Sequence, residues 1–318
     1  MCRTLFAPVI AALLSFASAA AGQTIITFDA PGSSATHPGR ISPGGKVVGY
    51  YEIGINFHGF MRDTDGSITT LDPPGATNSY AIAFNRAGQI VGSYVDSSSV
   101  YHGYLWSQAE GFTTFDVGTG DTSPADMSAA GDIAGDNFPQ AFLRKADGTV
   151  TLFSLGISTF ALGINSADQI IGQYTDTAGK EHAYLRNADG TVVTFDLGTG
   201  GTFPADINSA GLIAGVFYSG KQGGHGFVRN PDGTVVTFGR NDVEVTLANA
   251  INTSGTVVGW YTDLQGQSHG LLRTAKGKIT IIDVPGATFT ELLDISNVGT
   301  IVGQYGDALG NHGFIATK

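Results

Sequence analysis

The chain has 318 residues, 46 of them Gly, and its 27 acidic against 16 basic side chains give a formal charge of -11. This length allows a sizeable core, and a hydrophobic content of 42% argues against disorder, which goes with low hydrophobicity and high charge. The acidic balance argues against the function classes that depend on clustered Lys and Arg, namely sequence-independent nucleic-acid binding and docking on anionic lipid.

The N-terminus has the pattern of a secretory signal. Arg3 supplies a positive charge, an apolar run covers residues 5–14, and Ala19-Ala20-Ala21 is a cleavage site of the A-x-A kind. The alternative, a transmembrane anchor, needs ~20 apolar residues, which is more than this run provides. We therefore predict a signal peptide at residues 1–21 and a mature chain that is secreted or periplasmic, without membrane insertion. Cleavage would also remove Cys2, the single cysteine.

A repeat fills the rest of the chain. Segments such as HGFMR and HAYLR start at His58, His102, Gln140, His182, His225, His269 and His312, in steps of 38 to 44 residues. Each copy combines four short segments rich in Val, Ile, Thr, Phe and Tyr, separated by Gly, Asp, Asn and Pro. The 3.6-residue period of a helix is not seen. Four strands in a repeat of this length are typical of a β-propeller blade.

We therefore predict an all-β fold, a seven-bladed β-propeller with four antiparallel strands per blade, as a single domain over residues 24–318. The chain starts with a lone segment of the fourth type at residues 24–29 and ends after one of the third type at 312–316. Residues 24–30 are accordingly predicted to complete the last blade. This N-terminal strand would close the ring and remove an open sheet edge.

A His–Asp pair is predicted in most copies. The Asn-Pro-Asp-Gly segment at 230–233 fits a three-residue hairpin loop with Gly in the left-handed region, and this register places each repeat His opposite the residue 14 positions later. The predicted pairs are His58–Asp72, His102–Asp116, His182–Asp196, His269–Asp283 and, across the ring closure, His312–Asp29.

These pairs lie in different blades, whereas a metal site or catalytic dyad needs several groups at one place. We interpret them as hydrogen-bonded staples in which Asp raises the His pKa. Gln140 faces Ser154, so both partners are replaced together there.

Two further positions recur in the repeat. The first holds Arg62, Arg144, Arg186, Arg229 and Arg273 and is interpreted as a solvated or ion-paired blade edge. The second, in the second strand, holds Gly49, Gly92, Gly135, Gly172, Gly215, Gly259 and Gly303. A strand Gly marks close backbone approach, which we expect between neighbouring blades.

These repeat residues also carry a family resemblance. At His182-Ala183-Tyr184, Gln140-Ala141-Phe142 and the His-Gly-Phe copies, the chain resembles the HAF-type extracellular repeat family of bacteria. The resemblance covers nearly all of the mature chain. It implies secretion and a propeller-like fold, and it brings no established activity and no catalytic residues.

Candidate sites are expected where the copies differ. One such column in the innermost strand reads Arg40, Ala83, Asp126, Gly163, Asp206, Ala250 and Asp294. The carboxylates of Asp126, Asp206 and Asp294 would face the central channel at one height. There they could hold a Ca²⁺ ion through oxygen ligands, or act as an acid/base pair in sugar chemistry. The alternative is that each Asp caps its adjoining turn. No cofactor is required.

The other variable region is the face made by the loops that enter the first strands, which we call the loop face. Its candidate ligand-binding residues are His37, Tyr80, Phe160, Phe203 and Phe289. Short polar residues beside exposed aromatic rings suit stacking on sugars or a protein partner. The alternative is that the three phenylalanines begin strands and are buried.

Two functions remain. We favour an exported, non-enzymatic binding module, monomeric, that binds a glycan or protein ligand on the loop face and has no nucleic-acid partner. The alternative is a carbohydrate-active hydrolase or lyase that uses the channel carboxylates. HExxH, CxxC and GxSxG motifs are absent from the sequence, and His37 is the only His outside the repeated position, which favours the first function.

Overall fold

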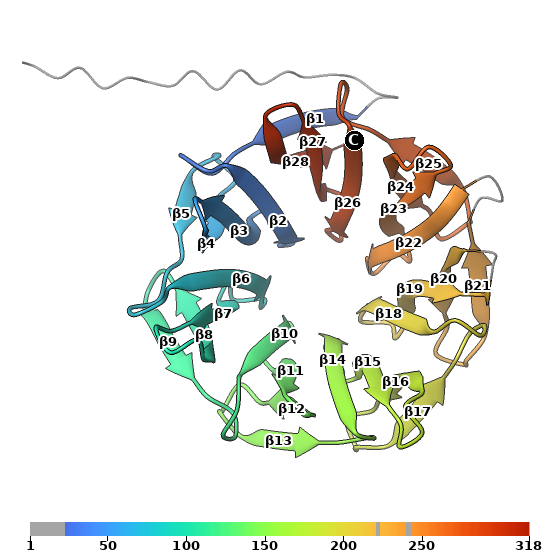
Figure 1. The fold of residues 1–318 in the computed structure, drawn as a ribbon, viewed down its shortest axis with the longest axis horizontal. Helices are drawn as coiled ribbons and strands as arrows, with labels where there is room; N and C mark the ends of the chain where they lie inside the picture. Colours follow the sequence, from blue (N-terminus) through green and yellow to red (C-terminus); the bar gives the residue numbers. More distant parts are fainter. Residues whose placement is uncertain (1–22, 221–222, 240–242, 318) are drawn as a thin grey trace, which may run out of the picture.

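The chain is an all-β protein. The computed structural model describes residues 23–220, 223–239 and 243–317, so the predicted signal peptide lies outside the described residues. The described residues form 28 strands and no α-helix, and no helix among them is long and apolar enough to cross a membrane. Figure 1 shows the strands arranged in small sheets around a central axis, as expected for a propeller-like fold.

Four classes of strand succeed one another from the axis outward. The innermost are β2 (Ala35–Ile41), β6 (Asn78–Phe84), β10 (Ser123–Met127), β14 (Ser158–Ile164), β18 (Thr202–Ile207), β22 (Val243–Ile251) and β26 (Phe289–Ile295). The second strands are β3 (Val47–Ile53), β7 (Ile90–Val95), β11 (Ile133–Asn137), β15 (Ile170–Thr175), β19 (Ile213–Tyr218), β23 (Val257–Asp263) and β27 (Ile301–Asp307).

The third strands carry the repeat histidines. They are β4 (Asn56–Arg62), β8 (Tyr101–Ser107), β12 (Gln140–Arg144), β16 (Glu181–Arg186), β20 (Gly224–Arg229), β24 (Ser268–Arg273) and β28 (Gly310–Thr317). The outer strands are β5 (Ile68–Thr70), β9 (Gly111–Phe115), β13 (Val150–Phe153), β17 (Val192–Phe195), β21 (Val235–Phe238), β25 (Ile279–Ile282) and β1 (Thr24–Phe28).

Strand pairing divides the described strands into groups of four. Three groups are separate sheets, and four are joined in twos by the single parallel bridges Ala35–Asn311 and Gly224–Val245. We number these groups as blades 1 to 7 by their inner strands, so that blade 1 is β2–β5 and blade 7 is β26–β28 with β1. In blade 7, β1 pairs antiparallel with β28, from Thr24–Thr317 to Phe28–Gly313, which places the first strand beside the last (Figure 1).

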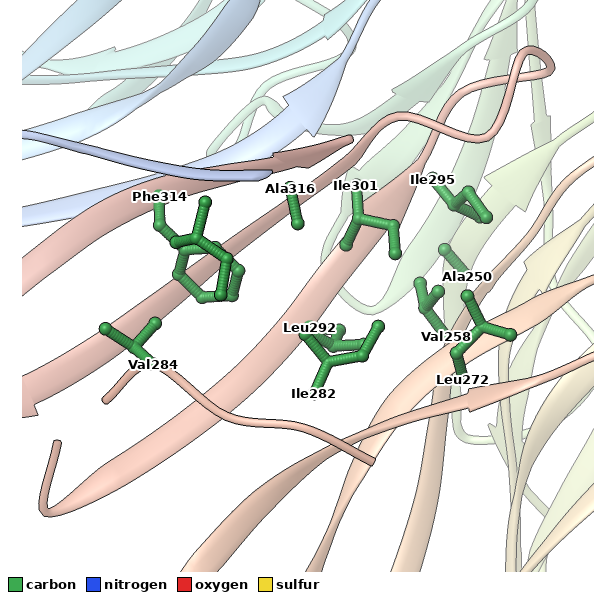
Figure 2. Close-up of a cluster of buried hydrophobic side chains, with 11 residues drawn as sticks. Ala250, Val258, Leu272, Ile282, Val284, Leu292, Ile295, Ile301, Phe314 and Ala316 are labelled. Atoms are coloured by element: carbon green, nitrogen blue, oxygen red, sulfur yellow. The ribbon is translucent and has the colours of Figure 1, made fainter. Parts of the chain in front are cut away.

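The hydrophobic core lies between neighbouring blades. Each of the seven junctions among the described residues holds its own cluster of buried side chains. Figure 2 shows the junction of blades 6 and 7, where Val258 and Leu272 lie near Leu292 and Ile301. Burying such a side chain contributes ~1.5–3 kcal/mol. The sheets are therefore held together mainly by face-to-face packing.

Every inner strand contains a β-bulge at the same place. The register with the second strand shifts between Pro38 and Arg40 in blade 1 and at the equivalent positions of the other six blades. A Cβ on Gly49 would collide with the carbonyl oxygen of His37, and the six equivalent glycines face the same obstacle. Glycine is therefore required by the bulged strand of the same blade. Our expectation of close approach between neighbouring blades was wrong.

The predicted His–Asp pairs are confirmed, with Nδ1–carboxylate distances of 2.7–2.9 Å in all five. Gln140 donates to Ser154 Oγ at 3.2 Å in their place in blade 3. The structure adds two partners that the sequence analysis missed. In blade 4, His182 Nε2 lies 3.2 Å from Asp176, and its ring stacks on Tyr174 at 5.0 Å. The hydrogen bond to Asp196 is the main cause that raises the pKa of His182.

The recurrent arginines are not solvated blade edges, contrary to our expectation. Arg62, Arg186, Arg229 and Arg273 are at most 9% exposed. Their guanidinium groups, and that of Arg144, lie 4.7–5.0 Å from a Phe ring on the outer strand of the preceding blade: Phe28, Phe115, Phe153, Phe195 and Phe238. These cation–π contacts tie each outer strand to the next blade.

Candidate ligand sites along the central channel

Three carboxylates from alternate blades converge on one guanidinium in the channel. Arg40 Nη2 lies 4.0 Å from Asp126 Oδ2, and its Nη1 lies 3.7 Å from Asp206 Oδ1 and 3.8 Å from Asp294 Oδ1. The four residues come from β2, β10, β18 and β26, and the three aspartates are at most 9% exposed. They therefore form one charged layer, which we call the Asp–Arg layer.

Each aspartate in this layer joins two blades. Asp126 accepts the N–H of the adjacent Met127 at 2.9 Å and that of Ile164, in the inner strand of blade 4, at 3.0 Å. Asp206 and Asp294 do the same, and their partners in the next blade are Ile251 and Ile41, both at 2.8 Å. The carboxylates are thus inter-blade connectors and do not cap the adjoining turns.

Charge in this layer is unbalanced, with three carboxylates and one guanidinium. Burial raises the pKa of Asp126, and it raises that of Asp294 to about 6, while Arg40 opposes both shifts. Burial lowers the pKa of Arg40, but the three carboxylates together raise it further, so the guanidinium remains charged.

The loop-face candidates are largely one layer of the channel. His37, Tyr80, Phe160 and Phe203 occupy the same register position in their inner strands, as do Ser123, Leu247 and Glu291. In blade 1, for example, His37 pairs with Tyr50, whereas Arg40 of the Asp–Arg layer pairs with Val48. The two layers are therefore two residues apart along the second strand, or roughly 7 Å. Phe289 is not in this layer, because it pairs with Gly306 of β27, two residues away from the Glu291–Gln304 pair.

Four aromatic side chains gather at the channel rim on the loop face, and we call them the rim aromatic cluster. His37 stacks on Tyr50 at 4.7 Å, Tyr50 meets Tyr80 edge-on at 5.2 Å, and Tyr80 stacks on Phe57 at 5.7 Å. All four are partly exposed. Sequence analysis missed Tyr50, although the cross-strand register places it directly opposite His37 and so provides the signal.

Polar groups surround this cluster. Glu52 Oε1 lies 3.0 Å from His37 Nε2, and Gln304 Oε1 lies 3.4 Å from His37 Nδ1. Gln304 in turn donates to Glu291 at 2.8 Å, so the rim of blade 7 is connected to blade 1. The rim therefore combines aromatic faces with hydrogen-bond acceptors.

The predicted phenylalanines are not simply buried strand starts. Phe160 is 37% exposed and lies 6.0 Å from Phe138, which is 64% exposed. Phe203 and Phe289 are partly exposed, and Phe203 meets Tyr218 edge-on at 5.7 Å. Phe160 and Phe203 are thus separate aromatic positions on the rim, outside the rim aromatic cluster.

A cavity of about 940 Å³ lies at the other end of the channel, where the inner strands turn into the second strands. Its lining includes turn residues from six blades, and Met61, Phe84 and Trp106 from blades 1 and 2. We call it the turn-face pocket. A smaller cavity of about 160 Å³ shares Phe84 and reaches the Asp–Arg layer. Sequence analysis did not predict this pocket. The one indication of it in the sequence is Trp106, which stands at the repeat position that holds Arg in five other copies.

Comparison with known proteins establishes the architecture. Neither protein-family models nor curated proteins match the sequence. A streptogramin B lyase structure aligns over 92% of this chain and 97% of its own, with 16% identity and a TM-score of 0.63. The β-propeller domain of the Trilobed protease from Pyrococcus furiosus aligns over 88% and 94%, with 10% identity and a TM-score of 0.65. The chain has a β-propeller fold.

A third structure, TolB from Acinetobacter baumannii, aligns over 74% of the chain described here and 62% of its own length, with 15% identity and a TM-score of 0.52. At these identities the likeness concerns the fold alone. The Pyrococcus propeller is described as having an open velcro topology, whereas here β1 pairs with β28. The resemblance to HAF-type repeats stays a prediction.

Proposed function

We propose that this protein is an exported, non-enzymatic binding module, built on a closed seven-bladed β-propeller. Its ligand, a glycan or another protein, docks on the loop face at the channel rim. The seven groups of four strands and the pairing of β1 with β28 support this architecture. Export is tested by N-terminal sequencing of the mature chain, which is expected to begin at Gly22.

The rim aromatic cluster is the observation that carries the binding role. Partly exposed rings of Tyr50, Phe57 and Tyr80 present apolar faces, and Glu52 and Gln304 place acceptors beside them. Aromatic faces beside hydrogen-bonding groups are what sugar rings and protein side chains both require. The ring contacts and hydrogen bonds hold these groups in place before a ligand arrives.

The carbohydrate-active hydrolase or lyase takes second place. A general base needs a free lone pair directed at the substrate, and a general acid needs a free proton directed at it. The carboxylates of Asp126, Asp206 and Asp294 each accept two backbone N–H groups and face Arg40. Their role in connecting blades explains this geometry without chemistry, and the likeness to a streptogramin B lyase concerns the fold alone.

A glycan array beside a reducing-sugar release assay tests the proposal. We expect retention of a ligand without release of reducing ends, and loss of that binding in Tyr80→Ala. Val236→Ala is the matched control, because Val236 is an exposed residue on the outer strand β21. Release of new reducing ends would favour the hydrolase. Binding that survives Tyr80→Ala would move the ligand away from the rim.

A Ca²⁺ ion in the channel remains a prediction. Among the described residues, no cluster of three His, Cys, Asp or Glu side chains is arranged to hold a metal. Arg40 already lies among the carboxylates, so a cation would have to compete with it. Calcium titration with a thermal-shift readout tests this, since binding to the native state raises the melting temperature. A rise limited to Arg40→Ala would show that the guanidinium takes the cation's place.

A further inference from the structure

The junction between blades 1 and 2 departs from the repeat. In five junctions the third strand supplies an Arg that lies over a Phe of the preceding outer strand. Where blade 1 meets blade 2, Leu71 stands at the Phe position and Trp106 at the Arg position. Where blade 6 meets blade 7, the corresponding residues are Ile282 and Ala316. Arg is thus found where a ring face is present to receive it.

Trp106 connects this junction with the turn-face pocket. Its partly exposed side chain packs against the cluster that contains Met61 and Leu71, and it lines the cavity together with Met61 and Phe84. The volume of about 940 Å³ lies at the upper end of the range of small-ligand pockets, ~300–1,000 Å³. A large aromatic surface therefore borders a cavity of ligand size.

The charge of this pocket is opposite to that of the protein. The described residues that line it include Lys46 and Arg86 but no Asp or Glu, although acids outnumber bases by 27 to 16 in the chain. Lys46 is held by Asp63 at 2.7 Å. Arg86 is exposed and has no ion pair among the described residues, so its charge is available to a ligand.

Hydrogen-bonding groups come from the turns of other blades. Ser166, Ser209 and Asn297 line the pocket from turns of blades 4, 5 and 7. At its inner end the pocket adjoins the smaller cavity and the Asp–Arg layer, where negative charge predominates. An anionic group of a ligand is therefore favoured at the Arg86 end, and neutral hydroxyl groups are favoured toward the channel.

We propose that the turn-face pocket binds an acidic oligosaccharide that contains a uronic acid. Trp106 stacks on the apolar face of one sugar ring, Arg86 pairs with the carboxylate, and Ser166, Ser209 and Asn297 bond to hydroxyl groups. An acidic peptide also pairs with Arg86 and hydrogen-bonds to these groups, but its Asp and Glu side chains offer Trp106 no flat apolar ring face. The inference rests on the proposed binding function but places this ligand on the face opposite the rim.

Isothermal titration with a uronate trisaccharide and a neutral trisaccharide of the same linkage tests the site. We expect the uronate to bind at least about tenfold more tightly, a difference that Arg86→Gln abolishes. Trp106→Ala should weaken both sugars, whereas Trp106→Phe should retain part of the affinity because a ring remains. Val236→Ala, at an exposed residue of the outer strand β21 and outside both proposed sites, is the control and should bind normally. Circular dichroism verifies that each variant is folded.

The outcomes separate this inference from the proposed function. Absence of uronate binding, equal affinity for the neutral sugar, or tighter binding of an acidic hexapeptide overturns the turn-face site. If the glycan array then finds another ligand that is lost in Tyr80→Ala, the rim proposal stands alone. Uronate binding that depends on Trp106, with no ligand lost in Tyr80→Ala, supports the turn-face pocket and overturns the rim.

Discussion

His312 Nδ1 lies 2.8 Å from Asp29 Oδ1, although the two residues are 283 positions apart in the chain. Asp29 directly follows β1, and His312 belongs to β28, so this hydrogen bond joins the first and the last of the described strands. On its other side, His312 Nε2 lies 3.0 Å from Asp307. The pair has the geometry of the His–Asp pairs within single blades, which shows that β1 occupies the position of an outer strand.

Deleting Thr24–Asp29 should destabilise the protein far more than Asp29→Ala. The deletion removes the buried side chains of Ile25 and Phe28, and the burial of each such side chain contributes ~1.5–3 kcal/mol to the free energy of unfolding. It also removes the ring beneath Arg62. Ile26 adds little because it is 39% exposed. Asp29→Ala should cost about 1 kcal/mol, the scale of one hydrogen bond. Urea unfolding compares the two, and equal losses would mean that β1 is not a structural strand.

Arg40→Ala should be strongly destabilising, by about 3–5 kcal/mol, because it leaves buried carboxylates without a counterion. The loss should be larger at pH 8 than at pH 5. The pKa of Asp294 is about 6 even beside Arg40, so without Arg40 the Asp294 carboxyl group is protonated on acidification and no longer repels its neighbours. Urea midpoints at the two pH values measure this. Combining Arg40→Ala with Asp294→Asn should restore part of the stability, and a pH-independent loss would contradict the argument.

Tyr104→Phe should stabilise the protein. The Tyr104 hydroxyl is fully buried and has no hydrogen-bond partner among the described residues, and such a group costs ~1–3 kcal/mol. Tyr184, at the same repeat position, donates to the carbonyl of Phe160 at 3.1 Å. Tyr184→Phe should therefore be destabilising by about 1 kcal/mol. Thermal unfolding of both variants decides the sign, and a loss of stability in Tyr104→Phe would indicate a partner for that hydroxyl.

Replacing His182 and Asp196 by Gln and Ser should reduce the pH dependence of stability. The double variant reproduces the natural pair Gln140–Ser154 of blade 3. The hydrogen bond to Asp196 and the contact with Asp176 raise the pKa of His182 above 6.5. Its contribution is thus complete below pH ~6.5 and is lost as the pH rises through the folded-state pKa. Urea unfolding should separate wild type from variant more at pH 5.5 than at pH 8.5; the reverse order would contradict a raised pKa.

Asp136→Asn should stabilise the protein at alkaline pH. Burial raises the pKa of Asp136 to about 7, although its Oδ1 accepts the N–H of Ala161 at 2.8 Å. The carboxyl group of Asp136 is therefore harder to ionise in the folded state than in the unfolded state. Between the two pKa values the folded state holds the proton that the unfolded state has lost, so the free energy of unfolding falls as the pH rises toward 7. Asn retains an acceptor without this penalty. Unfolding at pH 8 should favour the variant, and at pH 4 the advantage should vanish.

The sequence by itself determined what repeats within one blade. Hairpin geometry sets the offset of 14 residues between His and Asp, so one readable turn at Asn230–Gly233 predicts the five His–Asp pairs. The alternation and spacing of β-forming residues likewise predicted an all-β fold. These features depend on contacts between strands that follow each other closely, for which distance along the chain fixes distance in space.

Only the tertiary structure decided what happens between blades. Spacing placed Arg40, Asp126, Asp206 and Asp294 in one column, but the bulges and the curvature of the ring bring the carboxylates within 4.0 Å of the guanidinium and to the backbone of the next blade. The same holds for the arginines that lie over rings of the preceding blade, and for the cavity beside Trp106. Such contacts depend on how twisted sheets pack face to face, and a repeat length carries no information about that.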